Sequence, residues 1–188
     1  MIQKIGFAYV KGGLNDRGGS VRSKGVITYS PAFTLVPTYG CFNRCGYCNF
    51  RVDPGRDRWL TLVEARQRLM GLQGLGVREI LILSGEVHPA SKWRSPLIEL
   101  IRDLCELALE QGFIPHTNAG PLSLAEMQYL QEVNGSMGLM VEQVRGDLAV
   151  HRDAPSKRPE IRLQQLIWAG ELKIPFTTGL LLGIGEME

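Results

Sequence analysis

The stretch EILILSGEVHPASKWRSPLIELIRDLCELALEQGFIPHTN (residues 79–118) contains two short apolar runs separated by one long amphipathic segment. Neither run alternates with polar residues, which is typical of parallel strands whose two faces are both covered. Between them, residues 95–112 favour a helix with Ser95 as the N-cap, Pro96 at the first helical position and Gly112 as the stop. The stretch therefore predicts a strand, a helix and a second, parallel strand.

The same alternation continues on both sides of this unit. Apolar runs predict three further buried strands, at 33–39, 138–144 and 175–185. Two of the intervening helices begin with a capping box, formed by Thr61 with Glu64 and by Ser123 with Glu126. Five strands that alternate with helices predict an α/β fold with a parallel sheet, either an open sheet or a segment of a barrel.

The two ends of the chain differ from this regular core. Residues 11–25 are rich in glycine and charge, so we expect residues 1–25 to be a flexible lead-in and residues 26–188 to form the folded domain. The chain ends directly after the last predicted strand, with no helix to cover it, and an uncovered strand is unfavourable. We therefore expect the domain to be incomplete at its C-terminus, and the 188-residue chain to be inactive or poorly soluble on its own.

Composition and charge exclude several classes of protein. The 188 residues are 44% hydrophobic and 21% charged, which is typical of a globular domain with one substantial core. The net charge of +2, without a block of Lys and Arg, indicates neither nucleic acid nor a membrane as a partner. No run reaches the roughly 20 apolar residues of a membrane span, and the N-terminus lacks the apolar core of a signal peptide. We expect a cytoplasmic protein, where clustered cysteines favour metal or redox ligands over disulfides.

Three of the four cysteines lie together in YGCFNRCGYCNF (residues 39–50), directly after the first predicted strand: Cys41, Cys45 and Cys48. A zinc site usually has four ligands, often in two pairs, and no second Cys/His pair is visible. A redox pair accounts for Cys45 and Cys48 but leaves Cys41 unexplained. Three thiolates on a four-iron cluster leave one iron open, as a catalytic metal site requires. The fourth cysteine, Cys105, lies on the apolar stripe of its helix, and we expect it to pack in the core.

The spacing C-x3-C-x2-C, with an aromatic residue before the last cysteine, resembles the signature of the radical S-adenosylmethionine (SAM) superfamily. The resemblance implies a four-iron four-sulfur cluster held by Cys41, Cys45 and Cys48, whose fourth iron binds the amino and carboxylate groups of SAM. Four segments also resemble the small-subunit family of 7,8-didemethyl-8-hydroxy-5-deazariboflavin (FO) synthases: TYSPAFTLVPTYGCFNRCGYCNFRVDPG, LILSGEVHP, PHTNAGPLS and PFTTGLLLGIGE. The fold that this resemblance implies is a partial (βα) barrel, with five of about six strand–helix units.

In such a barrel the active site lies at the carboxyl ends of the strands. The resemblance implies that the turn Ser84-Gly85-Glu86 contacts the SAM amino group, although the superfamily usually has glycine in place of Ser84. By the same resemblance, Glu142 accepts hydrogen bonds from the ribose hydroxyls and Arg162 binds the SAM carboxylate. The remaining SAM-binding candidates are Tyr47, Asn118, Gly183 and Gly185.

Ordinary structural roles are the alternatives for these residues. Glu86 is otherwise an exposed turn residue, and Arg162 a helix-surface arginine. Glu142 lies inside an apolar run, where a carboxylate needs a partner, and a salt bridge with a core-facing arginine would also satisfy it. His88 and His151 are candidates for acid–base residues and His116 for lining the pocket, but no partner in the sequence assigns a role to any of them.

The resemblance also implies a reaction. Reductive cleavage of SAM would produce a 5′-deoxyadenosyl radical that closes the ring of a tyrosine/5-amino-6-ribitylaminouracil adduct to FO, with loss of ammonia, in coenzyme F420 biosynthesis. The implied partners are these small-molecule substrates, the large FO synthase subunit, and an electron donor such as ferredoxin or flavodoxin. Two alternatives stay open: another radical SAM enzyme, such as the partner subunit or a biotin-synthase relative, and a non-catalytic iron–sulfur or zinc protein.

Overall fold

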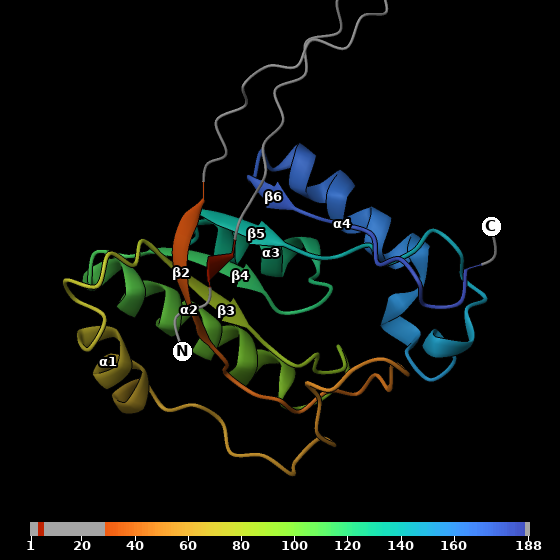
Figure 1. Cartoon of the computed structure of the whole chain (residues 1–188), viewed down its shortest axis with the longest axis horizontal. Coiled ribbons are helices and arrows are strands. Elements are labelled where there is room, and N and C mark those ends of the chain that lie inside the picture. The colour runs from red at the N-terminus through yellow and green to blue at the C-terminus, as the bar shows by residue number, and fades with distance from the viewer. Residues whose placement is uncertain (1–3, 6–28, 187–188) are drawn as a thin grey trace, which may run out of the picture.

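The computed structural model describes residues 4–5 and 29–186. These residues form six strands, four α-helices and two short 3₁₀ helices (Figure 1): β1 (Lys4–Ile5), β2 (Ser30–Leu35), α1 (Leu62–Met70), β3 (Glu79–Leu83), α2 (Arg94–Glu110), β4 (Ile114–Asn118), α3 (Leu124–Gln131), β5 (Ser136–Gly138), η1 (Ala149–His151), η2 (Pro155–Lys157), α4 (Pro159–Glu171) and β6 (Phe176–Thr177). The predicted lead-in, residues 1–25, lies outside the described residues except for β1, which pairs antiparallel with β2. Its flexibility therefore stays a prediction.

The strands form one sheet in the order β1-β2-β3-β4-β5-β6, and β2 to β6 are all parallel. Each parallel strand lies beside the next one in the sequence, as Figure 1 shows from orange to blue. Strand–helix–strand crossovers are almost always right-handed, so an order without a reversal places the connecting helices on one side of the sheet. In a doubly wound sheet the strand order reverses once, and the helices then cover both faces. The prediction of a parallel α/β sheet is confirmed, and its order is that of a barrel segment.

Helix α2 occupies the centre of the helical layer. It contacts β3 and β4 and lies between α1 and α3. Its buried stripe includes Leu97, Ile101, Leu104 and Cys105, none of which has any exposed surface. The prediction that Cys105 packs in the core is confirmed, and burial of this apolar stripe supplies much of the free energy that holds α2 to the sheet.

Both predicted capping boxes are present, at Thr61 with Glu64 and at Ser123 with Glu126. The predicted N-cap of α2 is wrong, because the helix begins at Arg94 and Ser95 lies inside it. The Arg94 side chain donates hydrogen bonds to the carbonyl of Val87, the carbonyl of Pro121 and the Glu126 carboxylate. These tertiary contacts hold the first turn where the sequence offers no side-chain cap.

The last two strands are shorter than predicted. β5 ends at Gly138 and β6 at Thr177, whereas the apolar runs predicted strands over 138–144 and 175–185. Beyond these ends, Glu142 adopts a left-handed backbone conformation (φ 68°) and pairs with Leu180 only in an isolated bridge. A left-handed residue turns the chain out of the extended geometry that a ladder needs. Leu139 and Val141 are therefore buried in irregular chain, whereas Val144, Leu180 and Leu182 are exposed.

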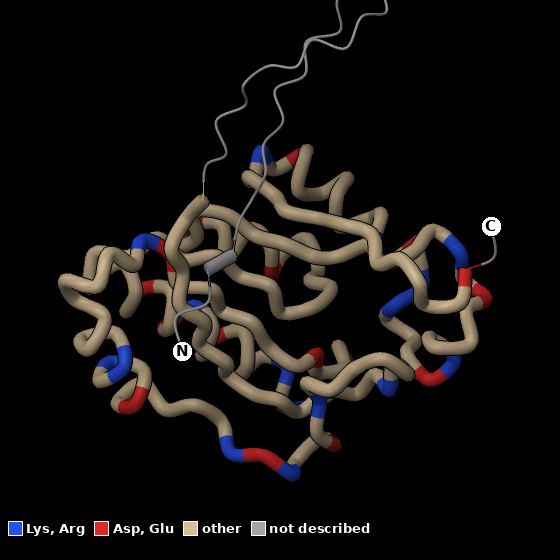
Figure 2. The backbone as a smooth tube through the Cα atoms, in the orientation of Figure 1, with Lys and Arg blue, Asp and Glu red and all other residues tan. Residues whose placement is uncertain are grey.

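Charges of both signs are interspersed along the described residues (Figure 2). Most ion pairs are exposed, as in Arg66–Glu110, whose side chains are 51% and 59% exposed. Arg94–Glu126 differs, with exposures of 8% and 21%, and it ties the first turn of α2 to that of α3. Within the described residues, no helix has both the length and the apolar character to cross a membrane.

We predict that Glu126→Gln lowers the free energy of unfolding by about 1–3 kcal/mol, because Arg94 is then left buried without its counter-charge. Glu110→Gln removes an exposed ion pair and is expected to cost about 0–1 kcal/mol. Urea titrations followed by circular dichroism measure both values, and equal losses would contradict the prediction.

The same pair predicts a pH dependence. Burial raises the pKa of Glu126, but hydrogen bonds from Arg94 and from the Ser123 backbone outweigh it and leave the pKa below the ordinary glutamate value. A lowered pKa stabilises the folded state above the unfolded-state pKa of about 4.3, and this stabilisation is lost as the pH falls through the folded-state value. The difference in unfolding free energy between wild type and Glu126→Gln should therefore be constant near neutrality and shrink below about pH 4.

Candidate functional site

A pocket of about 300 Å³ lies at the carboxyl ends of the parallel strands. Its walls come from the cysteine loop (residues 41–48), the ends of β3 and β4, and the segment that leads from β5 into α4. The lining includes most of the site residues predicted from the sequence: Cys41, Cys45, Tyr47, Cys48, Ser84, Gly85, Glu86, Asn118, Glu142 and Arg162. Gly183 and Gly185 are not in this lining and lie in irregular chain beyond β6.

The three cysteines of the loop are free thiols and partly exposed. Among the described residues, no three His, Cys, Asp or Glu side chains converge closely enough to hold a single metal ion. In a four-iron cluster each thiolate binds a different iron, so the ligands face a common space without converging. Three soft thiolates on one pocket therefore fit such a cluster.

The cysteine loop approaches the end of β3 unusually closely. Gly85 donates a backbone hydrogen bond to the Thr38 carbonyl at 2.8 Å, and Phe42 donates one to the Glu86 carbonyl at 3.0 Å. A Cβ atom at Gly85 would lie 2.4 Å from the Gly40 carbonyl oxygen, so only glycine permits this approach. The turn Ser84-Gly85-Glu86 thus determines how near the cysteines lie to the sheet.

The Glu86 carboxylate is buried and fully paired, so the alternative of an exposed turn residue is wrong. One oxygen accepts from Nη2 of Arg162 at 2.7 Å. The other accepts from Nδ2 of Asn43 at 2.8 Å and from the Ser156 hydroxyl. Gly120 lies against the same side chain, since a Cβ atom there would come within 2.5 Å of the Glu86 Cγ. Three segments far apart in the sequence, at residues 43, 120 and 156–162, therefore surround one carboxylate.

Arg162 is only 1% exposed, which excludes the helix-surface alternative. Besides Glu86, its guanidinium donates to the Met140 carbonyl at 2.7 Å and to the Ser156 carbonyl at 3.1 Å. Each of its three nitrogens thus has a protein acceptor. The arginine joins α4 to the irregular segment after β5, on the wall of the pocket.

Glu142 forms a salt bridge, but its partner is Lys157 and not the arginine considered from the sequence. Lys157 Nζ lies 2.6 Å from Glu142 and 3.9 Å from Glu86, and both members of the Glu142 pair are largely buried. Together with Arg162, these side chains place two cations and two carboxylates in alternation on the pocket wall. Such pairing offsets the cost of burying the charges.

Tyr47 and His151 form a second polar contact, 3.1 Å between the phenol oxygen and Nε2. Burial, then the nearby Glu142 charge, raises the pKa of Tyr47, so the phenol stays protonated at neutral pH. Burial, then the nearby Lys157 charge, lowers the pKa of His151 and favours the neutral ring. His88 and His116 do not line the pocket: His88 packs on Phe42, and His116 contacts Ser136.

Sequence reasoning missed four residues at this site: Asn43, Gly120, Ser156 and Lys157. A weak signal existed for two of them, because Ser156 and Lys157 belong to the polar stretch VHRDAPSK, from which only the histidine was considered. Asn43 stands between two cysteines, and Gly120 follows a strand end, but neither position alone indicates a contact with Glu86.

Comparisons with known proteins identify the family and the fold. The sequence-family model of the radical SAM superfamily matches residues 35–188. Two similar curated relatives are named 7,8-didemethyl-8-hydroxy-5-deazariboflavin synthase. The one from Nostoc sp. is 65% identical over 87% of this chain and 49% of its own length; the one from Synechocystis sp. is 65% identical over 86% and 52%. The chain thus spans about half the length of these relatives.

Solved structures show the same fold. The FeFe-hydrogenase maturase of Carboxydothermus hydrogenoformans superimposes with a TM-score of 0.71 at 23% identity, over 82% of this chain and 37% of that protein. Methylornithine synthase gives a TM-score of 0.67 at 17% identity, over 83% and 46%. At these identities the likeness concerns the barrel segment alone.

We predict that Gly85→Ala lowers the free energy of unfolding by about 1–3 kcal/mol, because the added methyl group overlaps the Gly40 carbonyl. Gly170→Ala is the matched control. Gly170 lies in α4 with open space around it, so alanine there should be neutral or stabilise by up to about 1 kcal/mol. Urea titrations measure both, and a neutral Gly85→Ala would show that the loop and β3 separate at little cost.

Proposed function

This chain belongs to the radical SAM superfamily, and we propose that it forms the cluster- and SAM-binding part of an FO synthase. The observation that carries the proposal is that Cys41, Cys45 and Cys48 share one pocket with Glu86 and Glu142. Thiolates for a cluster then lie in one space with two carboxylates, which would exchange some of their present partners for the amine and ribose of SAM. The identity to relatives of this name supports the choice of FO synthase within the superfamily.

When bound, a four-iron cluster with an open iron supplies the electron that cleaves SAM into methionine and a 5′-deoxyadenosyl radical. The residues of this chain provide the surroundings for that step. The three thiolates hold the cluster, and the turn at Ser84, Gly85 and Glu86 meets the SAM amino group. Tyr47, Asn118 and the two glycines beyond β6, Gly183 and Gly185, are proposed to contact other parts of SAM.

Charge on the pocket wall suits a ligand that carries both signs. SAM has an ammonium group, a sulfonium and a carboxylate, and the wall presents Glu86 and Glu142 beside Lys157 and Arg162. In this proposal Glu142 accepts hydrogen bonds from the ribose hydroxyls of SAM. Arg162 binds the SAM carboxylate.

The reaction and partners follow the same proposal. The substrate would be an adduct of tyrosine and 5-amino-6-ribitylaminouracil, closed to FO with loss of ammonia. A large FO synthase subunit would supply the adduct, and ferredoxin or flavodoxin the electron. A reducing, cytoplasmic setting is proposed because the three loop cysteines are free thiols.

We predict that the 188-residue chain, reconstituted anaerobically with iron and sulfide, binds one four-iron cluster, and that Cys45→Ala loses it. Cys105→Ala is the matched control and should keep the cluster, because Cys105 is buried on the inner face of α2, outside the lining of the pocket. Iron content and electron paramagnetic resonance (EPR) spectra of the reduced cluster measure the result. A wild-type spectrum that does not change when SAM is added would support a non-catalytic iron–sulfur protein, and retention of zinc alone a zinc protein.

We also predict that Glu142→Ala weakens SAM binding about tenfold to a hundredfold, as expected for the loss of hydrogen bonds to a charged group. Glu132→Ala serves as control, since Glu132 is an exposed residue that pairs with Arg102. Equilibrium binding of SAM to the cluster-loaded variants measures the effect. If Glu142→Ala binds SAM as tightly as wild type, Glu142 does not bind the ribose hydroxyls.

A further inference from the structure

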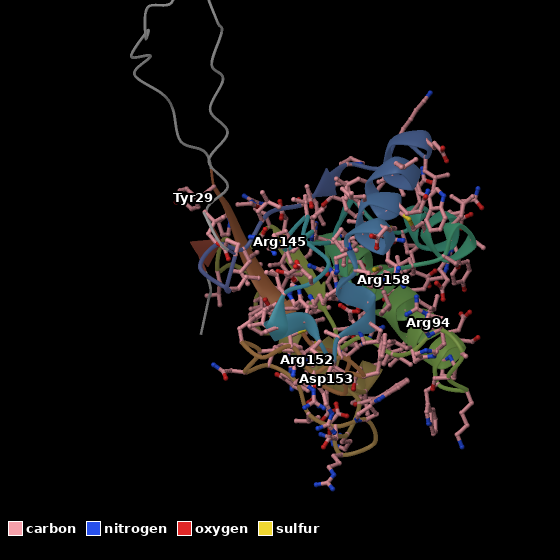
Figure 3. The ribbon with its side chains drawn as sticks, turned by 90° about the vertical axis from the view of Figure 1, so that its right-hand side faces the viewer. Tyr29, Arg94, Arg145, Arg152, Asp153 and Arg158 are labelled. Atoms are coloured by element: carbon pink, nitrogen blue, oxygen red, sulfur yellow. The ribbon has the colours of Figure 1, made fainter. Side chains whose placement is uncertain are left out.

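The connection between β5 and α4 lies along the cysteine loop. Its segment 149–157 includes η1 and η2. Two backbone hydrogen bonds join the segment to the loop: Arg44 N donates to the Asp153 carbonyl at 2.7 Å, and Gly46 N to the Val150 carbonyl at 2.8 Å. In Figure 3, Arg152 and Asp153 mark this segment beside the loop.

A side-chain contact reinforces the backbone pairing at one end of the loop. Asn43 is 1% exposed, and its Nδ2 donates to the Ser156 hydroxyl at 2.8 Å, while its Oδ1 accepts from Ser156 N at 3.2 Å. The same Nδ2 reaches Glu86 at 2.8 Å. Asn43 therefore connects the loop with both the segment and the end of β3.

A second side-chain contact lies at the other end, where Tyr47 meets His151. Four loop positions, 43, 44, 46 and 47, thus contact segment 149–157 through hydrogen bonds. The loop has no regular secondary structure that would fix its shape. Its internal hydrogen bonds are short-range: Cys48 N donates to the Cys45 carbonyl, and Nδ2 of Asn43 donates to Cys41 Sγ at 3.9 Å. The positions of its cysteines therefore depend on partners outside the loop.

We propose that segment 149–157 positions the cysteine loop, and that the contact between Asn43 of the loop and Ser156 of the segment is the principal link. Asn43 and Ser156 are therefore positioning residues. Neither residue ligates the cluster. By clamping the loop between the segment and Glu86, they hold Cys41 and Cys45 at the spacing that the cluster requires. The inference rests on the proposed function for the identity of the cluster, but the clamp itself exists in the cluster-free chain.

The first test uses the cluster-free 188-residue chain. Asn43→Ala and Ser156→Ala should each raise the alkylation rates of Cys41 and Cys45 by iodoacetamide about fivefold or more, because a clamped loop exposes its thiols less often. Cys105 reports on global unfolding and should stay unreactive. The double variant should react more slowly than the product of the two single increases predicts, because both substitutions remove the Asn43–Ser156 contact, although each also removes its own hydrogen bond to Glu86.

Matched controls remove similar groups elsewhere. Asn134→Ala deletes an amide that bonds Thr117 and Leu130, and Ser136→Ala a hydroxyl that bonds His116. Both controls should leave the alkylation rates of Cys41 and Cys45 unchanged. Unchanged rates in the Asn43 and Ser156 variants, or additive effects in the double variant, would overturn the proposal.

The second test separates this inference from the proposed function. After anaerobic reconstitution, the clamp variants should hold less iron per chain than wild type and give a broadened EPR spectrum of the reduced cluster. If wild type itself binds no cluster, the proposed function fails. The alkylation rates still show whether Asn43 and Ser156 hold the loop in the cluster-free chain. If wild type and both variants bind the same cluster with the same spectrum, the positioning role fails and the proposed function stands.

Discussion

The site depends on the hydrogen bonds and the ion pair that satisfy the buried carboxylate of Glu86. A charge taken out of water costs several kcal/mol unless it is paired and hydrogen-bonded. Glu86 meets this requirement only when the cysteine loop, η2 and α4 are all in place, since Asn43, Ser156 and Arg162 come from these three elements. The network therefore assembles as a unit: removing one partner leaves a buried charge or donor unsatisfied, and the loss extends to all of its neighbours.

The sheet makes this convergence possible. Parallel strands in unbroken order direct all their carboxyl ends toward one edge, so loops from different crossovers meet there. Two glycines then allow the close contacts. Gly85 lets the cysteine loop approach β3, and Gly120, with φ of 80°, lets the chain after β4 pass against the Glu86 side chain. A side chain at either position would separate elements that the carboxylate holds together.

Charge pairing also shapes the pocket. Lys157 lies between Glu142 and Glu86, and Arg162 pairs with the Glu86 oxygen that Lys157 approaches. The four charges balance within the protein, which stabilises the wall without a ligand. Under the proposed function, a zwitterionic cofactor exchanges some of these pairs for its own groups. The same short segment, 149–157, serves both the loop and the charged wall. Ser156 bonds Asn43 of the cysteine loop, and the next residue, Lys157, pairs with Glu142.

The sequence by itself determined the features that local patterns encode. Apolar periodicity predicted the order of strands and helices, the capping boxes at Thr61 and Ser123 were correct, and the apolar stripe of α2 predicted the burial of Cys105. The spacing of the cysteines, through its resemblance to a known signature, indicated the family.

Only the tertiary structure decided where α2 begins, where β5 ends, and which partners Glu86 and Glu142 have. The helix begins at Arg94 because that side chain reaches residues near α3, and β5 ends at Gly138, before the chain turns at Glu142 to meet Lys157. Asn43 and Ser156 lie 113 positions apart, so no local pattern could join them. Periodicity and caps act over one or two turns of chain, whereas a buried charge selects its partners from whatever the fold brings within hydrogen-bond distance.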